Sequence, residues 1–503
     1  MNGYLLGIDN GGTVTKAALF NTEGHELVVA SRKVKIIQMF SGWNERDANQ
    51  MWNDTCNVIH EVLHNSRVNP SEILAVACTG HGNGLYLVDA NGNPVRNAIN
   101  STDTRAQKYI DEWRTTGVGE TVRPYTAQSL WAGQPNALLS WLRDQEPHTL
   151  QQAKWMLMAK DFTRMKLTGE FFAEITDMSG TSLMNIRKRD YDDRVLNIFG
   201  LEELRNLLPP LIESADLSGR ISSKAASETG LKAGTPVAGG MFDVDACALA
   251  SGIIDEEQIS LVLGTWGNNQ YIAKEPLIDK DLFMSSIYSI PGWYLILEGS
   301  PTSVSNLDWF IDNFLQHEKS LLGTQFFDWL NLQVDTVPVE FSEITFLPFL
   351  YGCNDGRNLP ASFYGIKGNH TRSHLIRAVY EGIAFSHKTH IDRLLKFRKA
   401  PEVIRCSGGA TQSAVWMQMF ADAFGIPVEV PRGKQLGALG AAMAAAVCIG
   451  IYKNMEESLR QMTGSRIRFE PNRNNSKAYH YKYQNYKELI NKINYTNHNS
   501  HKA

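Results

Sequence analysis

The sequence predicts an α/β protein built from two large domains of related architecture. Its 503 residues exceed what one ordinary hydrophobic core supports. A strand, a glycine turn and a second strand are expected over 4–20, and the same pattern returns over 259–273. Each unit opens roughly half of the chain, which indicates a duplicated architecture.

The elements of the first half follow from short apolar runs and their spacing. Leu5, Leu6 and Ile8 form the first expected strand, Gly11 and Gly12 form the turn, and apolar residues resume directly afterwards. Further patterns predict one strand at 73–78 and helices at 51–63 and 136–142.

The second half begins with an apolar run at 259–263, a turn at 264–267 and a further strand at 270–273. A helix at 244–249 is expected to connect the halves, which gives domains 1–247 and 248–503. Residues from about 491 are rich in Asn, His and Lys, so we expect a frayed tail there.

Composition excludes several classes of protein. Hydrophobic residues make up 43% and charged residues 20%, which is ordinary for a globular protein, and the net charge of −4 does not favour a nucleic-acid partner. The first residues lack a signal-peptide pattern, and we find no apolar run that is long enough to span a membrane. The cysteines are scattered without metal-ligand spacing, which favours reduced thiols and a cytoplasmic protein: Cys56, Cys78, Cys247, Cys353, Cys406 and Cys448.

The first glycine turn has the residues that a phosphate chain needs. Glycines at 11 and 12 let backbone N–H groups approach phosphate oxygens, since no Cβ is in the way. Asp9 ends the preceding strand and could hold Mg²⁺ through water, and Lys16 could add a positive charge. An ordinary hairpin turn explains the same pattern, so both interpretations stay open.

Two later glycine turns have similar features. Gly264 and Thr265 offer backbone groups and a hydroxyl to a terminal phosphate. Gly408 and Gly409 follow a short expected strand and precede a helix expected from about Ser413, an arrangement that favours a nucleotide. A plain strand–helix connection is the alternative. The run of small residues at 437–446 is interpreted as a closely packed helix.

Two carboxylates stand at the expected junction between the halves. Asp243 or Asp245 could accept a hydroxyl proton while that oxygen attacks phosphorus, but Asp is also favoured as a helix N-cap. Composition and spacing do not separate these roles. His387 and His390, three residues apart on an expected helix, are interpreted as hydrogen-bonded histidines and not as metal ligands.

These motifs, in this order, resemble the FGGY carbohydrate kinases of the actin, hexokinase and Hsp70 superfamily. The stretch from Ala361 to Ile366, followed by His374-Leu375 and by 378–381, fits the C-terminal signature of that family. Its other signature is nearly met by 133–145, where Leu138 replaces the usual lysine. The resemblance implies two actin-like, ribonuclease H-like domains with a cleft between them, and a sugar kinase that uses ATP and Mg²⁺.

The resemblance also implies roles for single residues. Asp243 would be the catalytic base, with Asp245 as second choice, and Asp9 would face Mg²⁺. The residues expected to bind ATP come from the three glycine turns: Gly11, Gly12, Thr13, Lys16, Gly264, Thr265, Gly408, Gly409, Ala410 and Ser413.

The expected sugar pocket draws on two further segments. Where xylulokinases carry Gln, Met and His, this chain has His81, Gly82 and Asn83. At positions that lie near the substrate in relatives, it has Asp103 and Arg105. The replacing residues can still form hydrogen bonds with the hydroxyls of a sugar, although the sugar can differ from that of the xylulokinases.

Several stretches, among them 42–47 and 299–303, resemble the L-xylulose kinases of the family. L-Xylulose is therefore the first candidate substrate, and D-xylulose, ribulose or erythritol are the alternatives. A non-catalytic, nucleotide-gated sugar-binding protein is the alternative of another class. Family habit suggests a homodimer with no nucleic-acid or membrane partner.

Overall fold

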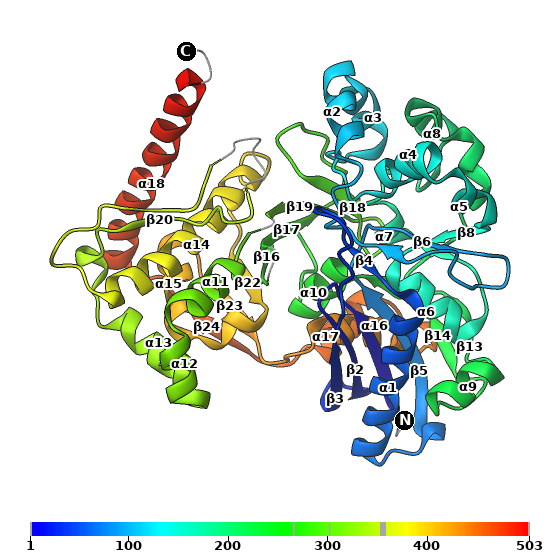
Figure 1. The fold of residues 1–503 in the computed structure, drawn as a ribbon. Helices are drawn as coiled ribbons and strands as arrows, with labels where there is room; N and C mark the ends of the chain where they lie inside the picture. Colours follow the sequence, from blue (N-terminus) through cyan, green and yellow to red (C-terminus); the bar gives the residue numbers. More distant parts are fainter. Residues whose placement is uncertain (1–2, 265–266, 301, 353–358, 501–503) are drawn as a thin grey trace.

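The computed structural model describes residues 3–264, 267–300, 302–352 and 359–500. Two large mixed sheets, each with its own helices, form two bodies (Figure 1). No helix within these ranges is both long and apolar enough to cross a bilayer.

The first sheet has the strand order β13-β14-β5-β1-β2-β3, with β15 paired to β5. β1 runs antiparallel to β2 and parallel to β5, so the first expected hairpin is confirmed. The bounds of its strands are β1 Tyr4–Asn10, β2 Val14–Asn21, β3 Glu26–Lys33, β5 Ile73–Gly80, β13 Leu217–Arg220, β14 Pro236–Ala238 and β15 Met241–Phe242.

The second sheet repeats this plan in the order β18-β19-β17-β16-β22-β23-β24. β16 runs antiparallel to β17 and parallel to β22, as β1 does with β2 and β5, which confirms the predicted duplication. The bounds of its strands are β16 Gln258–Leu263, β17 Gly267–Ala273, β18 Met284–Ile287, β19 Tyr294–Ser300, β22 Val403–Ser407, β23 Val428–Pro431 and β24 Arg466–Phe469.

Helices cover the first sheet and form a lobe beside it. α1 Ala48–Ser66 begins at Asp47, whose carboxylate accepts hydrogen bonds from two backbone N–H groups of the first turn, and it packs on β2 and β3. α6 Ala159–Thr168 also packs on the first sheet, against β5. The lobe beside the sheet is built from α2 Gln107–Thr116, α3 Val118–Thr126, α4 Pro135–Gln145, α5 Pro147–Gln152, α7 Ile175–Met178 and α8 Asp193–Phe199 (Figure 1).

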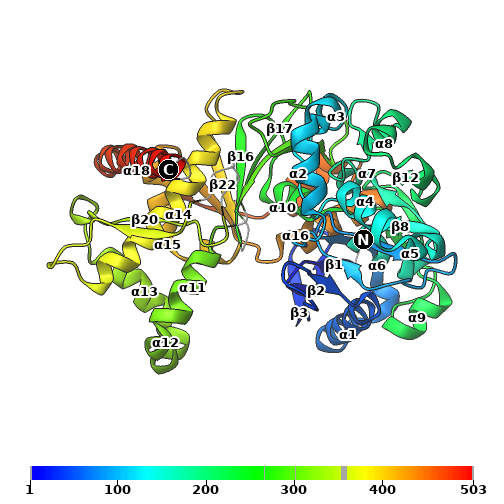
Figure 2. The ribbon, with the colours of Figure 1, turned by 45° about the horizontal axis from the view of Figure 1, so that its top comes forward.

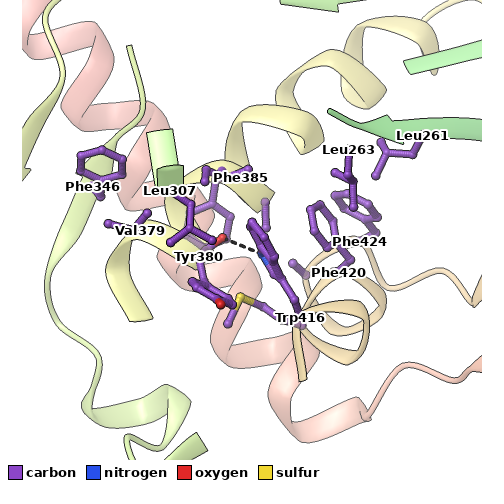
Figure 3. Close-up of a cluster of buried hydrophobic side chains, with 14 of the residues drawn as sticks. Leu261, Leu263, Leu307, Phe346, Val379, Tyr380, Phe385, Trp416, Phe420 and Phe424 are labelled. Atoms are coloured by element: carbon purple, nitrogen blue, oxygen red, sulfur yellow. Dashed lines mark hydrogen bonds between the residues drawn. The ribbon is translucent and has the colours of Figure 1, made fainter. Parts of the chain in front are cut away.

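The second body has an aromatic core between its helices and the second sheet. Trp416 on α15 Ala414–Phe424 packs against Tyr380 on α14 Arg372–Leu394, with ring centroids 4.3 Å apart, and its indole N–H donates to the Tyr380 carbonyl at 3.2 Å (Figure 3). Leu261 and Leu263 of β16 face the same cluster, which fixes the helices to the sheet.

One helix from late in the chain packs on the first sheet. α16 Leu436–Cys448 lies against β1, β5 and α10 Asp243–Ser251 (Figure 2), and the close-packing interpretation of its small residues is confirmed. A Cβ added to Gly7 would lie 2.0 Å from the Ala438 carbonyl oxygen, and one added to Gly440 would lie 2.5 Å from the Ala246 oxygen. The missing side chains therefore allow this contact. The division of the chain at residue 247, which falls within α10, stays a prediction.

The segment expected to fray is the end of a long helix, and its fraying stays a prediction. α18 Arg473–Ser500 continues through this segment, because Tyr479, Tyr483, Tyr486 and Ile490 recur at helical spacing and are buried against the second body. The residues that anchor this helix to the second body precede the polar segment.

A fully buried ionic cluster lies beneath the carboxyl end of β5. The Lys160 ammonium is 3.1 Å from carboxylate oxygens of both Asp161 and Asp177 and 3.5 Å from Glu174, and Arg164 also pairs with Asp161. Burial raises the pKa of Asp177 to about 7, although Lys160 opposes the rise. Removing one partner from such a cluster would leave a buried charge uncompensated.

We predict that Gly7→Ala lowers the free energy of unfolding by about 2–3 kcal/mol, because the new methyl group overlaps the Ala438 carbonyl. Chemical denaturation measures this difference. Gly464→Ala is the control, since no atom lies within 4 Å of its Cβ position. Equal stability of the two variants would contradict the described contact.

We predict that Asp177→Asn changes how stability depends on pH. A carboxyl whose pKa rises on folding stabilises the fold below its unfolded value, and that contribution is lost as the pH rises through about 7. The wild type should therefore lose a few kcal/mol relative to the variant between about pH 4 and 7. Denaturation across this range tests the change, with Asp193→Asn at an exposed carboxyl as control. Parallel curves would show that Asp177 titrates normally.

Candidate active site

The predicted catalytic segments meet at one edge of the first sheet. In the parallel register of β1, β5 and β15, Asp9 lies beside Thr79, and Phe242 lies beside Gly80. The first glycine turn, the loop that follows β5 and Asp243 therefore leave adjacent strands in the same direction. Ligands of open α/β sheets bind at such carboxyl edges.

A cavity of about 380 Å³ lies where these segments face the second sheet. Asp243 lines it together with Gly12 and Thr13 of the first turn and Asn268 of β17. Residues of both halves therefore line one cavity beside Asp243, as predicted. Thr265 of the second turn lies outside the described residues. The described lining residues are Gly12, Thr13, Ile36, Asn44, His81, Gly82, Asn83, Asn100, Ser101, Thr102, Trp131, Phe242, Asp243, Val244, Asn268, Phe283, Met284 and Leu297.

The structure separates the two candidate bases on α10. Asp243 is the first helical residue, and Phe242 holds the cap position without a side-chain bond, so the N-cap interpretation of Asp243 does not apply. Burial, and then the nearby carboxylates of Asp9 and Asp177, hold the pKa of Asp243 well above its usual value. Asp245 is fully buried outside the cavity lining and accepts a hydrogen bond from the Ser289 N–H at 3.2 Å.

Asp9 and Lys16 lie opposite each other in the first hairpin. Burial raises the pKa of Asp9, and the Lys16 ammonium opposes the rise, so both charges act on the same space. At Gly12 no atom lies within 4 Å of an added Cβ, which leaves room for a phosphate group against the backbone. Carboxylates at 9 and 243 beside open space fit a Mg²⁺ ion that takes its other ligands from phosphate and water.

Gly264 of the second glycine turn lies beside the start of the third turn. β16 and β22 are parallel, with Val262 beside Ser407, so Gly264 and Gly408 follow adjacent strand ends. Gly408 has φ +100°, and a Cβ there would lie 2.3 Å from the Leu263 carbonyl oxygen. Gly408 and Gly409 are both exposed, as a nucleotide site requires.

The connection after Gly408 differs from a direct strand-to-helix turn. A short 3₁₀ segment, η5 Gly409–Gln412, contains Ala410 and precedes α15. Ser413 caps α15 by accepting from the Trp416 N–H at 3.1 Å, and its hydroxyl donates to Asn331 at 2.5 Å. Contacts of Ala410 and Ser413 with adenosine stay predictions.

The loop after β5 lines the cavity with all three of its residues that were predicted to bind the sugar, and their contact with a sugar stays a prediction. His81 Nε2 is 3.0 Å from the Tyr86 hydroxyl, and burial lowers the pKa of His81 to about 4, so its ring is neutral at neutral pH. Gly82 leaves room for the Phe242 ring and the Asp177 carboxylate, since a Cβ would lie 2.3 Å and 2.8 Å from them. Asn83 adopts a left-handed conformation with φ 59°.

Asp103 and Arg105 are placed differently from expectation, because neither lines the cavity. Their fully buried side chains form an ion pair of 2.9 Å, and Arg105 also contacts Glu45 at 2.8 Å. Asp103 accepts a hydrogen bond from the Asn44 N–H at 2.6 Å. In this conformation the pair therefore orients the lining residue Asn44, and direct substrate contact stays a prediction.

Several lining residues had no role in the sequence prediction. Asn100, Ser101 and Thr102 directly precede Asp103, and their polar run was the available signal. Trp131 and Phe283 come from the two halves, and their ring centroids are 4.9 Å apart. Periodicity could not indicate this pair, since it joins loops that are distant in the chain.

The remaining candidate side chains lie away from the cavity. His387 is hydrogen-bonded to Ser303 and Asn269, and His390 to Glu298, so the interpretation as hydrogen-bonded histidines is confirmed. The five described cysteines are free, as predicted; Cys353 lies outside the described residues.

Comparisons with known proteins agree with this geometry. The model of the FGGY carbohydrate kinase N-terminal domain matches residues 4–250, and that of the C-terminal domain matches 259–449. An L-xylulose/3-keto-L-gulonate kinase from Escherichia coli (strain K12) is 37% identical over 97% of both chains. A xylulose kinase from Bacillus subtilis (strain 168) is 27% identical over 97% of this chain and 96% of the relative.

Solved structures show the same architecture. A crystal structure of a xylulose kinase from Rhodospirillum rubrum superimposes with a TM-score of 0.86 at 25% identity, covering 97% of this chain and 99% of the other. The same family follows from both family models, from the relatives that match along their full length, and from the duplicated sheets around one cavity. The chain belongs to the FGGY family of carbohydrate kinases and is a sugar kinase that uses ATP.

Proposed function

We propose that this kinase transfers the γ-phosphate of ATP to a hydroxyl of a small ketose, with L-xylulose as the first candidate. The observation that carries the proposal is the shared cavity, in which Asp243 lies between the first glycine turn and the loop at His81 to Asn83. A phosphate chain and a sugar that occupy these two sides would meet at the carboxylate.

In the proposed mechanism Asp243 acts as the general base. Its carboxylate accepts the proton of the sugar hydroxyl while that oxygen attacks the γ-phosphorus, and ADP leaves with the bridging oxygen. The raised pKa of Asp243 makes it a better proton acceptor than an exposed carboxylate. Backbone N–H groups at Gly11 to Thr13 and the Lys16 ammonium would stabilise the charge on the phosphates.

Asp9 would hold Mg²⁺, with Asp243 nearby. When bound, the ion neutralises phosphate charge during transfer. On the nucleotide side, Gly264, Thr265, Gly408 and Gly409 are proposed to contact ATP, because the described glycines follow adjacent strand ends at the second sheet.

L-Xylulose is placed first because of the resemblance of several stretches and the name of the E. coli relative, which also includes 3-keto-L-gulonate. D-Xylulose is the nearest alternative, given the B. subtilis relative. Ribulose and erythritol follow. Family membership favours catalysis over the nucleotide-gated binding protein. A homodimer and a cytoplasmic location stay predictions.

A substrate panel tests the proposed sugar. ADP release is measured in a coupled assay with L-xylulose, D-xylulose, both ribuloses and erythritol. We expect L-xylulose to give the highest kcat/KM. A much higher value for another sugar would overturn the choice of substrate while leaving the kinase assignment in place.

We predict that Asp243→Ala lowers kcat about 10³-fold with little change in fold, because the base that accepts the proton is removed. Steady-state ADP release and circular dichroism measure the two effects. Asp245→Asn is the matched control on the same helix, since it keeps the acceptor for the Ser289 N–H. Near-normal turnover of the alanine variant, or an equal loss in the control, would exclude Asp243 as the specific base.

We predict that Asp9→Asn raises the Mg²⁺ concentration for half-maximal activity about tenfold or more, since one anionic ligand is lost. A titration of activity with MgCl₂ at saturating ATP measures the shift. An unchanged midpoint would remove Asp9 from the metal site.

A further inference from the structure

We infer that the sugar cavity selects an uncharged ketose and rejects the sugar acid that differs from it by one carboxylate. This inference rests on the proposed function and concerns its two leading substrates. 3-Keto-L-gulonate is L-xylulose with a carboxylate in place of one hydrogen on C1, so the two compounds differ in charge and little else.

The groups that line the cavity are neutral or acidic. Two of the described lining residues titrate, namely Asp243 and His81, and burial lowers the pKa of His81 to about 4, so that ring carries no charge at neutral pH. The polar remainder consists of amides and hydroxyls: Asn44, Asn83, Asn100, Asn268, Ser101, Thr102 and Thr13. Hydroxyl and carbonyl groups of a sugar suit such partners, because each can donate or accept a hydrogen bond.

The lining offers a ligand carboxylate no group of opposite charge among the described residues. Asp243 lines the cavity beside Gly12 and Thr13, where the proposed function places the phosphates of ATP. A carboxylate on the sugar would therefore lie in the same cavity as an acidic side chain and an anionic nucleotide.

Among the described cations around the cavity, Lys16 faces Asp9 across the first hairpin and is assigned to the phosphates, and three others are engaged by the protein itself. Arg105 is paired with Asp103 and Glu45, and Lys160 with three carboxylates. Arg46 donates to the Thr15 hydroxyl at 2.7 Å and to the Gly11 carbonyl at 3.3 Å. To pair with a ligand, each would have to give up a buried partner.

Two exposed lysines, Lys280 and Lys396, line a neighbouring cavity. Trp131 and Phe283 line both cavities, and their rings form an edge-to-face pair between them. A sugar on the Asp243 side is therefore shielded from these lysines by two aromatic rings. A carboxylate there would lose its water shell without gaining a cation, whereas a hydroxyl would not incur this cost.

The decisive experiment compares the two compounds directly. We expect kcat/KM for L-xylulose to exceed that for 3-keto-L-gulonate about 100-fold or more, since a polar mismatch in a closed site commonly produces discrimination of this size. Isothermal titration calorimetry with each compound, without ATP, measures the same preference in binding. If the kcat/KM values for the two compounds lie within tenfold of each other, the inference is overturned.

A pair of variants tests whether charge is the cause. Thr102 is an exposed lining residue, so Thr102→Lys adds a cation at the cavity rim, and Thr102→Gln adds similar length without charge. The ratio of kcat/KM for L-xylulose to kcat/KM for 3-keto-L-gulonate should be at least tenfold lower in the lysine variant than in the glutamine variant. If both variants lower this ratio equally, the shape of the cavity and not its charge causes the discrimination, and the inference fails.

The outcomes also separate this inference from the proposed function. If neither compound supports ADP release, the proposed substrates are wrong, and the calorimetric preference alone then decides the charge selectivity of the cavity. If L-xylulose is phosphorylated and the sugar acid binds equally well, the proposed function stands and the charge selectivity is excluded.

Discussion

The close contact between α16 and the edge of the first sheet is the constraint on which the site depends. Gly7 and Gly440 have no side chains, so α16 can reach both β1 and α10 at backbone distance. Gly437 lies against the Asp9 carboxylate, because a Cβ there would lie 2.8 Å from its Oδ2 atom. A helix from late in the chain thus contacts both Asp9 and α10, and this contact holds Asp243 in place relative to the first glycine turn.

The second constraint is electrostatic. Burial is the main cause of the raised pKa of Asp177 and of Asp243, and neighbouring carboxylates add to it, although Lys160 opposes the rise. In the proposed function these surroundings strengthen Asp243 as a proton acceptor. The proposed charge selectivity has a different origin, namely the uncharged amides and hydroxyls that line the cavity.

The residues that best identify the family serve mainly to build the fold. Glu381 of the C-terminal signature is buried and pairs with Arg377 at 2.8 Å and with Lys482, far from the lining residues of the cavity. Gly133 of the other signature lets α4 approach the segment that carries Ser101, since a Cβ would lie 1.9 Å from its carbonyl oxygen. Family recognition from such motifs therefore supports the architecture more directly than it supports the substrate.

The sequence by itself indicated the two hairpins, the duplicated architecture, the three glycine turns and the pair of candidate bases, because strand periodicity, turn chemistry and a family signature are local properties of the chain. The tertiary structure decided what depends on long-range packing. It placed Asp243 in the cavity lining and Asp245 outside it. It also showed that Asp103 accepts a hydrogen bond from the lining residue Asn44 and does not itself line the cavity. Trp131 and Phe283, which come from the two halves, form a ring pair. The tertiary structure also anchored α18 to the second body through Tyr479, Tyr483 and Tyr486, which lie in its first half. Burial and the distance between charges arise only when distant segments meet, so residue spacing cannot reveal them.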